Sequence, residues 1–478
     1  MKRFFPSWAA GQRRPQAGEA LPAHAASDPP GAASATGLPG HIGRYRVMQR
    51  LGSGATAEVF LARDDFSSRL VAIKRMLVQQ EGACEGETDF LPRFFAAEAA
   101  LVGRLNHPNI VQILDADAHA QPPFLVMEYV PGGTLREFCA ADHLLPLDQV
   151  VDAGFKCAQA LDHVYRQGVV HRDIKPANIL YSRSGGHGLD VKISDFGSAF
   201  NFTSDQTQVF RVGSLSYMPP EQLDGKDLDH RADQYALCAV LYHLIAGRAP
   251  FEAANHGMLV HQIYSQTPLL LDQRRQNLPP ALVALVARGL AKDPAERWPD
   301  WAQVAQQLAD LVSRGDLGQA SQQEVLDTER FALLRGLEFF GGFNDVQLWE
   351  VARRGHWQRF AAGEALFTPG EIGGRFYILG RGRVEVFRGD LRVADLGSGT
   401  SVGEMAYLAP SPELRQHSAL VRASEATTAL GLTVESMAQF SAETRHCFDQ
   451  AFIQVLVRRL HAAHESLAHP RQILPPSR

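Results

Sequence analysis

The amino-acid sequence predicts an α+β protein with two structured parts, and three observations lead to this fold class. The larger first part begins with strand-like patterns and continues with helix-like ones. A short polar stretch follows, and the second part alternates apolar and polar residues between glycine-rich turns before a final amphipathic helix pattern. A length of 478 residues suits two or three domains of ~100–200 residues each.

The chain begins with residues 1–40, which are rich in Ala, Gly and Pro and have almost no periodic apolar pattern. Such a segment cannot bury enough apolar surface to offset the entropy lost on ordering. We expect a disordered tail.

The larger part covers residues 44–312. Short strands are expected within 45–64 and 70–77, where branched and apolar residues stand between turn residues. Helical spacing of apolar residues follows at 93–105 and 150–168, and it dominates from Asp233 to Asp310.

Residues 313–328 are polar and are expected to form a linker, and residues 329–465 form the second part. Period-two alternation at 376–397 predicts hairpins. The amphipathic helix pattern that ends this part could mediate dimerisation, although packing on its own domain is the simpler interpretation. Residues 466–478 are expected to be a C-terminal tail.

Composition excludes several classes of function. A formal net charge of −5 offers no basic surplus for nucleic acid, and no stretch approaches the ~18 apolar residues of a membrane helix. The five cysteines are scattered without metal-type spacing, which is typical of a reducing compartment with thiols packed as small apolar groups. We expect a cytoplasmic protein that binds neither nucleic acid nor membrane.

Gly52, Ser53 and Gly54 lie between two strand-like runs. A glycine turn lets backbone N–H groups approach phosphate oxygens closely, because no Cβ stands in the way. The third glycine position of such a loop holds Ala57, and the motif alone is also compatible with a plain hairpin.

Lys74 ends an apolar strand pattern, Val71 to Lys74. A buried ammonium needs an anionic partner, which phosphate oxygens or the carboxylate of Glu98 in a helical segment could supply. A lone lysine of this kind is otherwise a surface residue.

The strongest signal is the run from His171 to Asn178, followed by Asp195, Phe196 and Gly197. With the glycine loop and the strand lysine, in this order, the chain resembles the serine/threonine branch of the protein kinases over residues 44–312. The resemblance implies a bilobal protein kinase fold, ATP as substrate and transfer of phosphate to Ser or Thr of protein substrates.

The resemblance also assigns roles. Asp173 would orient the substrate hydroxyl and accept its proton, Lys175 would neutralise the γ-phosphate, and Lys74 would bind the other phosphates and pair with Glu98. Asn178 and Asp195 would hold Mg²⁺. Further contacts to ATP are implied for Leu51, Gly52, Ser53, Gly54, Ala57, Val59, Ala72, Met127 (the gatekeeper position), Glu128 and Val130.

Scaffold and regulatory positions follow from the same resemblance. Glu221 would form a buried ion pair with Arg297, and Asp233 would fix the backbone of the loop that carries Asp173. Arg172 usually pairs with a phosphate on the segment 195–221. Candidate sites there are Thr203, Ser204 and Thr207, which are equally compatible with plain exposed loop residues.

The second part resembles the cyclic-nucleotide-binding domains, through residues 360–387, 396–408 and 417–423. This resemblance implies a β-roll or jelly roll with flanking helices. Turns are expected at Gly363, at Gly370, at Gly380 or Gly382, and at Gly397 or Gly399.

The family's phosphate cassette begins with Gly-Glu, as Gly403 and Glu404 do here. Glu404 would accept the ribose 2′-hydroxyl, and the N–H of Gly403 would reach the phosphate. The usual arginine is replaced by His417, before Ser418, with Arg415 two residues earlier. Arg415 could reach in, His417 could serve weakly, or the pocket could have lost its ligand and become a docking module.

The leading prediction is an active serine/threonine kinase whose output is adjusted by its C-terminal domain, with cyclic AMP or cyclic GMP as a candidate regulator. The alternatives are a kinase with a ligand-free docking module, and a pseudokinase scaffold that holds nucleotide without transfer. Lys74, Asp173, Asn178 and Asp195 are all present and argue against the scaffold.

Overall fold

The computed structural model describes residues 38–54, 57–77, 105–183, 189–196, 215–313, 317, 327–409 and 416–468. The chain divides into two compact units, Met1–Gln322 and Gln323–Arg478. Each unit mixes helices with antiparallel sheets, as the sequence predicted. Most of the expected N-terminal tail and linker lies outside the described residues.

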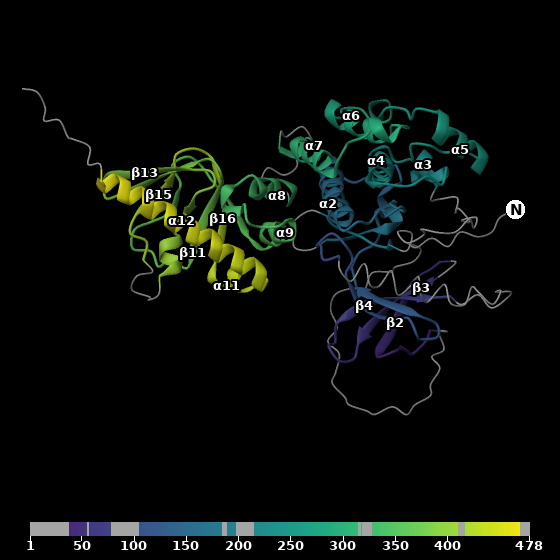
Figure 1. Ribbon diagram of the computed structural model, residues 1–478, viewed down its shortest axis with the longest axis horizontal. Coiled ribbons are helices and arrows are strands. Elements are labelled where there is room, and N and C mark those ends of the chain that lie inside the picture. Colours follow the sequence, from purple (N-terminus) through teal and green to yellow (C-terminus); the bar gives the residue numbers. More distant parts are fainter. Residues whose placement is uncertain are drawn as a thin grey trace, which may run out of the picture. The chain divides into compact units, whose positions relative to one another are not determined.

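The first unit begins with a six-stranded antiparallel sheet, drawn in purple and blue in Figure 1. Apolar residues on one face of these strands, among them Phe60, Ile73 and Val126, form a buried cluster. The strands, in spatial order, are β1 (His41–Ile42), β2 (Tyr45–Ser53), β3 (Ala57–Asp64), β4 (Leu70–Met76), β6 (Phe124–Glu128) and β5 (Ile113–Asp117).

Helices predominate in the rest of the described first unit (Figure 1). They are α2 (Leu147–Arg166), α3 (Pro220–Leu223), α4 (His230–Ala246), α5 (His256–Ser265), α6 (Pro280–Gly289) and α7 (Trp301–Ser313). Helix α4 is apolar and buried almost all round, as expected for a helix at the centre of a lobe. Gly154 of α2 lets the two helices approach, because a Cβ there would lie 2.9 Å from Leu241 of α4.

Short elements connect the sheet and the helices. A two-stranded antiparallel sheet, β7 (Ile179–Ser182) and β8 (Asp190–Ile193), follows α2. The single-turn helices are η1 (Leu135–Phe138), η2 (Pro176–Asn178), η4 (Leu215–Tyr217), η5 (Leu271–Gln273) and η6 (Pro294–Glu296).

The second unit is built on two four-stranded antiparallel sheets. Their facing sides enclose an apolar core that includes Phe360, Phe367, Tyr377 and Val384. One sheet has the order β10 (Ala365–Phe367), β15 (Leu420–Ala423), β12 (Arg383–Arg388), β13 (Leu391–Gly397). The other has the order β14 (Ser401–Val402), β11 (Arg375–Arg381), β16 (Thr427–Thr433), β9 (His356–Phe360).

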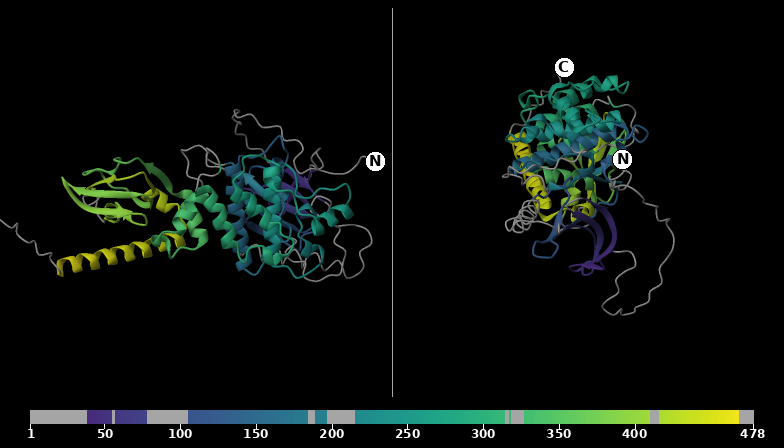
Figure 2. Two further views of the ribbon diagram at one scale, coloured as in Figure 1. Left: turned by 90° about the horizontal axis from the view of Figure 1, so that it is seen from above. Right: turned by 90° about the vertical axis from the view of Figure 1, so that its right-hand side faces the viewer.

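Helices flank this roll, and α12 runs along one side of it in the left view of Figure 2. They are α8 (Asp327–Arg335), η7 (Glu338–Phe340), α9 (Asp345–Arg354), α10 (Glu404–Leu408), α11 (Val434–Ala438) and α12 (Ala442–Ala468). Phe448 and Phe452 of α12 contact Phe339 of η7, so aromatic rings fix the first half of α12. No helix in the described part of the chain is both long and apolar enough to cross a membrane.

Three cysteines of the first unit are buried, as expected for thiols packed as apolar groups. Burial raises the pKa of Cys139, Cys157 and Cys238 to about 12. Cys447 in α12 is half-buried.

Candidate active site

The loop between α2 and β7 carries the run from His171 to Asn178. The carboxylate of Asp233 on α4 accepts hydrogen bonds from the backbone N–H groups of His171 (2.8 Å) and Arg172 (2.9 Å). Asp233 is buried, and burial raises the pKa of its carboxyl group. The predicted role of Asp233 in fixing this loop is confirmed, and it holds Arg172 at a positive φ of 67°.

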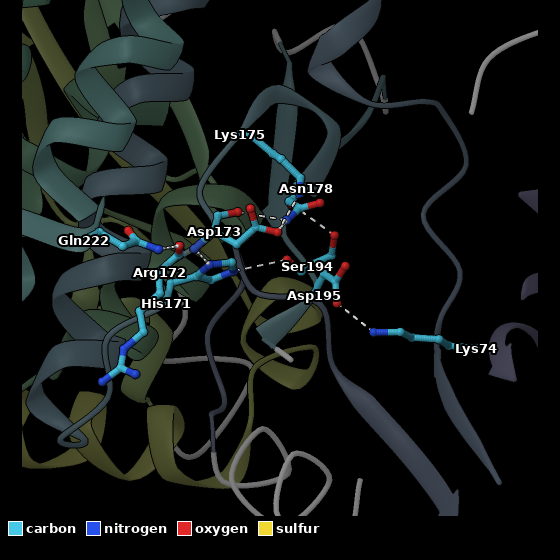
Figure 3. A network of polar contacts seen from close by, with 9 residues as sticks. All are labelled: Lys74, His171, Arg172, Asp173, Lys175, Asn178, Ser194, Asp195 and Gln222. Carbon is cyan, nitrogen blue, oxygen red and sulfur yellow. Dashed lines mark hydrogen bonds and ion pairs between the residues drawn. The ribbon is translucent and has the colours of Figure 1, made fainter. Parts of the chain in front are cut away.

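Asp173 is held by two donors from its own loop (Figure 3). Lys175 Nζ donates to Asp173 Oδ2 at 2.6 Å, and Asn178 Nδ2 donates to the same oxygen at 3.0 Å. Asn178 Nδ2 also donates to the backbone oxygen of Asp173 at 2.8 Å. Because both side-chain donors take Oδ2, the loop fixes the carboxylate while leaving Oδ1 for a further donor.

Asp195 lies beside this loop. Ser194 joins the two segments, since its N–H and its hydroxyl both donate to the backbone oxygen of Asn178, at 2.8 and 3.0 Å. Lys74 Nζ reaches across from β4 and donates to Asp195 Oδ1 at 2.7 Å. The ammonium of Lys74 lowers the pKa of the Asp195 carboxyl to about 2, so this group is ionised at any physiological pH.

The oxygens of Asn178 and Asp195 fit a magnesium ion. The amide nitrogen of Asn178 is used by Asp173, which leaves its amide oxygen as the group available to a cation. The Asp195 side chain is 45% exposed and has a positive φ of 66°. Mg²⁺ prefers hard oxygen ligands and is usually bound through one or two protein groups together with phosphates.

The sheet brings the predicted ATP contacts onto neighbouring strands. Val59 pairs with Gly52 on one side and with Lys74 on the other, and Ala72 pairs with Met127. These registers place the glycine turn, the lysine and the gatekeeper position on adjacent strands of one sheet.

Glu128 is engaged in a way that the sequence did not indicate. Its Oε1 accepts from Lys192 Nζ at 2.8 Å and from the backbone N–H of Gln112 at 2.9 Å. The backbone N–H of Glu128 also donates to the backbone oxygen of Gln112 at 3.0 Å, so neither this N–H nor the carboxylate is left for a nucleotide.

Two further residues support the loop. Arg297 forms a buried, bidentate ion pair with Glu221 at 2.6 and 3.0 Å, which confirms the predicted scaffold pair. Gln222 Nε2 donates to the backbone oxygen of Arg172 at 2.8 Å, a contact that sequence reasoning missed. The sequence feature that could have indicated Gln222 is its position directly after Glu221, which was already assigned to the scaffold.

Several predicted residues lie outside the described part of the chain. They are Glu98, the candidate phosphorylation sites Thr203, Ser204 and Thr207, and Arg415.

The predicted cassette residues of the second unit lie at the turn between β14 and α10. Gly403 has a φ of 84°, and a Cβ at this residue would lie 2.6 Å from the ring of Phe367. The carboxylate of the next residue, Glu404, is buried, and its Oε1 accepts from Arg459 Nη1 of α12. Its Oε2 is buried without a hydrogen-bond partner among the described residues, which makes it a candidate acceptor for a donor that the structure does not contain.

His417 fits a cyclic phosphate less well. Its ring stacks on Phe367 with centroids 4.0 Å apart, and burial lowers its pKa, so the ring is neutral near pH 7. Its backbone is fixed by hydrogen bonds of 2.9 Å to Gly370 and Glu371. A neutral ring beside an acidic residue does not supply the positive charge that the usual arginine brings.

The site of the first unit brings together a strand lysine, two aspartates, an asparagine and a second lysine. This combination of groups defines a phosphoryl-transfer class of site. The chain belongs to the protein kinase family, because the sequence model of the protein kinase domain matches residues 45–309, more than half of the chain. The model of the cyclic nucleotide-binding domain matches residues 357–444.

Curated relatives are similar to this chain over more than half of its length. The serine/threonine-protein kinase PknB of Mycobacterium leprae is 35% identical over 307 residues, which is 62% of this chain and 47% of that protein. Probable serine/threonine-protein kinases of Corynebacterium efficiens and Clostridium perfringens are 34% and 32% identical, over 59% and 53% of this chain and 43% and 36% of theirs. The chain thus spans about half the length of these relatives or less.

Proposed function

We propose that this protein is a serine/threonine kinase that transfers the γ-phosphate of ATP to a protein hydroxyl. One observation carries the proposal: the hydrogen-bonded network that joins Lys74, Asp195, Asn178, Asp173 and Lys175. Positioning and charge neutralisation account for most of the catalysis in phosphoryl transfer, and this network supplies both.

Asp173 is the residue that would meet the substrate hydroxyl. With Oδ2 held by Lys175 and Asn178, Oδ1 is positioned to accept the hydroxyl hydrogen bond and then the proton. The hydroxyl oxygen forms the new bond to the γ-phosphorus, the bond to the β-phosphate bridging oxygen breaks, and ADP leaves.

The cationic residues would offset the charge of the phosphates. Lys74 would face the α- and β-phosphates from β4, and Lys175 would face the γ-phosphate from the loop. Mg²⁺ held by Asn178 and Asp195 would neutralise phosphate oxygens as a Lewis acid. Because these groups supply positioning and charge neutralisation, the transfer needs no covalent nucleophile on the protein.

We also propose that a small ligand at the second unit modulates the kinase, with cyclic AMP and cyclic GMP as the first probes. The Oε2 of Glu404, which is buried and has no hydrogen-bond partner among the described residues, supports a ligand with a hydroxyl donor. The proposal also includes phosphorylation at Thr203, Ser204 or Thr207. The phosphate group would pair with Arg172. The homodimer and the cytoplasmic location stay predictions.

The first experiment measures transfer from ATP to a generic Ser/Thr acceptor protein in the presence of Mg²⁺. Asp173→Asn is expected to lower kcat by about 10²–10⁴-fold, the range for loss of a general base. Asp272→Asn, at an exposed carboxylate of η5, is the matched control and should leave kcat unchanged.

The rival scaffold function has a different outcome. A scaffold would bind ATP but show no transfer above the level of Asp173→Asn, and that result would overturn the proposed activity. Transfer that does not respond to either cyclic nucleotide would leave the kinase standing and favour the docking-module alternative for the second unit.

A further inference from the structure

A pocket of about 500 Å³ lies beside α6 in the helical part of the first unit. Its volume falls in the range of about 300–1,000 Å³ that is usual for small-molecule sites. The lining comes from α4, from α6 and the segment that follows it, and from residues 267–271 between α5 and η5. Among these described lining residues, none belongs to the candidate active site.

The lining contains both buried and exposed apolar side chains. Val286 and Leu290 are buried, whereas Leu269 and Leu270 are 50% and 42% exposed. Covering exposed leucines in a concave site with another apolar group is favourable, because it removes apolar surface from water. The lining therefore favours a ligand with an apolar chain.

Tyr242 of α4 adds a polar group to this lining. The residue is 2% exposed, and its hydroxyl has no hydrogen-bond partner among the described residues. Buried polar groups are nearly always hydrogen-bonded. The hydroxyl is therefore a candidate partner for a group that the structure does not contain.

Two basic residues of the lining are bonded to backbone oxygens. Arg288 donates to the backbone oxygens of Glu296 and Arg297, each at 3.1 Å. Lys292 Nζ donates to the backbone oxygen of Ile263, near the end of α5, at 2.5 Å. Within the described ranges, neither basic side chain forms an ion pair with a carboxylate.

The pKa of Lys292 reflects this lack of a carboxylate. Nζ lies 4.0 Å from the centroid of the Phe251 ring, and burial, followed by the charge of Arg297, lowers the pKa of the ammonium to about 8. Asp293 and Glu296 are the acidic residues of the described lining, and both are exposed. A carboxylate supplied by a ligand would favour the charged form of Lys292.

We propose that this pocket binds a small carboxylate with an apolar chain, such as a free fatty acid of medium length. The apolar side chains hold the chain, Lys292 pairs with the carboxylate, and Arg288 adds a second positive charge. Charge complementarity selects a carboxylate over a neutral molecule of the same shape. This site goes beyond the proposed function, because it requires neither ATP nor the second unit.

The first measurement is calorimetric titration of the full chain with octanoate and with 1-octanol, which has the same chain length and no charge. Octanoate is expected to bind more tightly by about tenfold or more, because it gains a charge-assisted contact. Equal affinities would show that the carboxylate is not recognised, and absence of octanoate binding would overturn the proposal.

A pair of lysine variants tests the position of the carboxylate. Lys292→Met removes the charge and keeps an unbranched side chain, so it should weaken octanoate binding by about tenfold and leave octanol binding nearly unchanged. Lys226→Met is the matched control, because Lys226 is an exposed lysine outside the lining that pairs with Asp224. Equal effects of the two variants on octanoate would refute the assignment of Lys292.

A pair of alanine variants tests the position of the chain. Ala287→Trp places a large ring in the lining, whereas Ala284→Trp places the same ring on an exposed part of α6 outside it. Octanoate binding should be lost in Ala287→Trp and kept in Ala284→Trp. If Ala287→Trp unfolds at the wild-type temperature and still binds octanoate, the pocket is not the site. If Ala287→Trp does not fold, the lysine pair decides.

Proton uptake gives a readout that is independent of affinity. With a pKa of about 8, Lys292 is partly neutral at pH 8, and a paired carboxylate raises this pKa. Binding of octanoate at pH 8 should therefore take up a fraction of a proton, measured by titration in two buffers of different ionisation enthalpy. Lys292→Met should abolish this uptake, and an unchanged uptake would contradict the proposal. These titrations contain no ATP, so their failure leaves the proposed kinase activity standing.

Discussion

Lys74 and Asp195 are 121 residues apart in sequence, yet they form one ion pair. Sequence reasoning assigned both to the same nucleotide without pairing them, since each belongs to its own short motif. The structure places Lys74 on a central strand and Asp195 just after β8, and their contact follows from the packing of these two segments.

Replacing Lys74 with Met is expected to raise the pKa of Asp195 from about 2 toward its ordinary value of 3.8. The folded pKa is lowered, so the pair stabilises the fold above about pH 4, and this stabilisation is lost as pH falls toward 2. Side-chain carboxyl NMR through an acid titration measures the shift. Lys192→Met, which removes the partner of Glu128 instead, should leave Asp195 unchanged; equal shifts in both variants would refute the assignment.

Asp233 gives a second prediction at the scale of single residues. Asp233→Ala leaves the buried N–H of His171 and the part-buried N–H of Arg172 without an acceptor, at a cost of up to about 1–3 kcal/mol each. Asp233→Asn keeps one acceptor oxygen, so it should destabilise the first unit less. Urea unfolding of both variants tests this order, and equal losses of stability would contradict it.

Among the elements, the strands and turns of the second unit were the most predictable. Each single glycine named as a turn, Gly363 and Gly370, has a positive φ. Of the two alternatives offered at each later turn, Gly382 and Gly399 have a positive φ. Period-two alternation located the strands, but it cannot show which of two neighbouring glycines takes the left-handed conformation.

Gly403→Ala should destabilise the second unit more than Gly399→Ala does. Both residues have φ near 84°, where an L-residue is strained by about 1–2 kcal/mol. At Gly403 the added Cβ also meets the Phe367 ring at 2.6 Å, whereas at Gly399 the nearest atom is 3.9 Å away. Crowding of this kind adds about 1–3 kcal/mol. If the unfolding midpoints of the two variants fall equally, the ring of Phe367 moves aside without cost and the prediction is wrong.

The residues that sequence reasoning missed belong to contacts between elements. Gln222, Lys192 and Arg459 carry no motif of their own, and each bonds a residue far away in the chain. Arg459 is 55 residues from Glu404 on a helix whose pattern indicated only amphipathicity. By contrast, the run from His171 to Asn178 was recognised because its residues are contiguous.

At the scale of the whole molecule, the chain forms two compact units that are expected to unfold separately. Arg297→Met leaves Glu221 as a buried unpaired charge and should destabilise the first unit by about 3–5 kcal/mol. Hydrogen exchange measured peptide by peptide should show no change in the second unit. Arg248→Met, which removes an exposed pair with Glu252, is the control and should cost less than about 1 kcal/mol. If Arg297→Met also increased hydrogen exchange in the second unit, that result would contradict independent folding of the two units.

The buried thiols make selective labelling of the second unit practical. Thiolates, not thiols, react with maleimides, and groups with a pKa near 12 are almost never ionised at pH 7. Once Cys84, which lies outside the described residues, is replaced by serine, Cys447 becomes the reactive position. Its sulfur lies 3.5 Å from Gln347 Oε1 of α9, so a fluorophore there would report in real time when α12 leaves its neighbour.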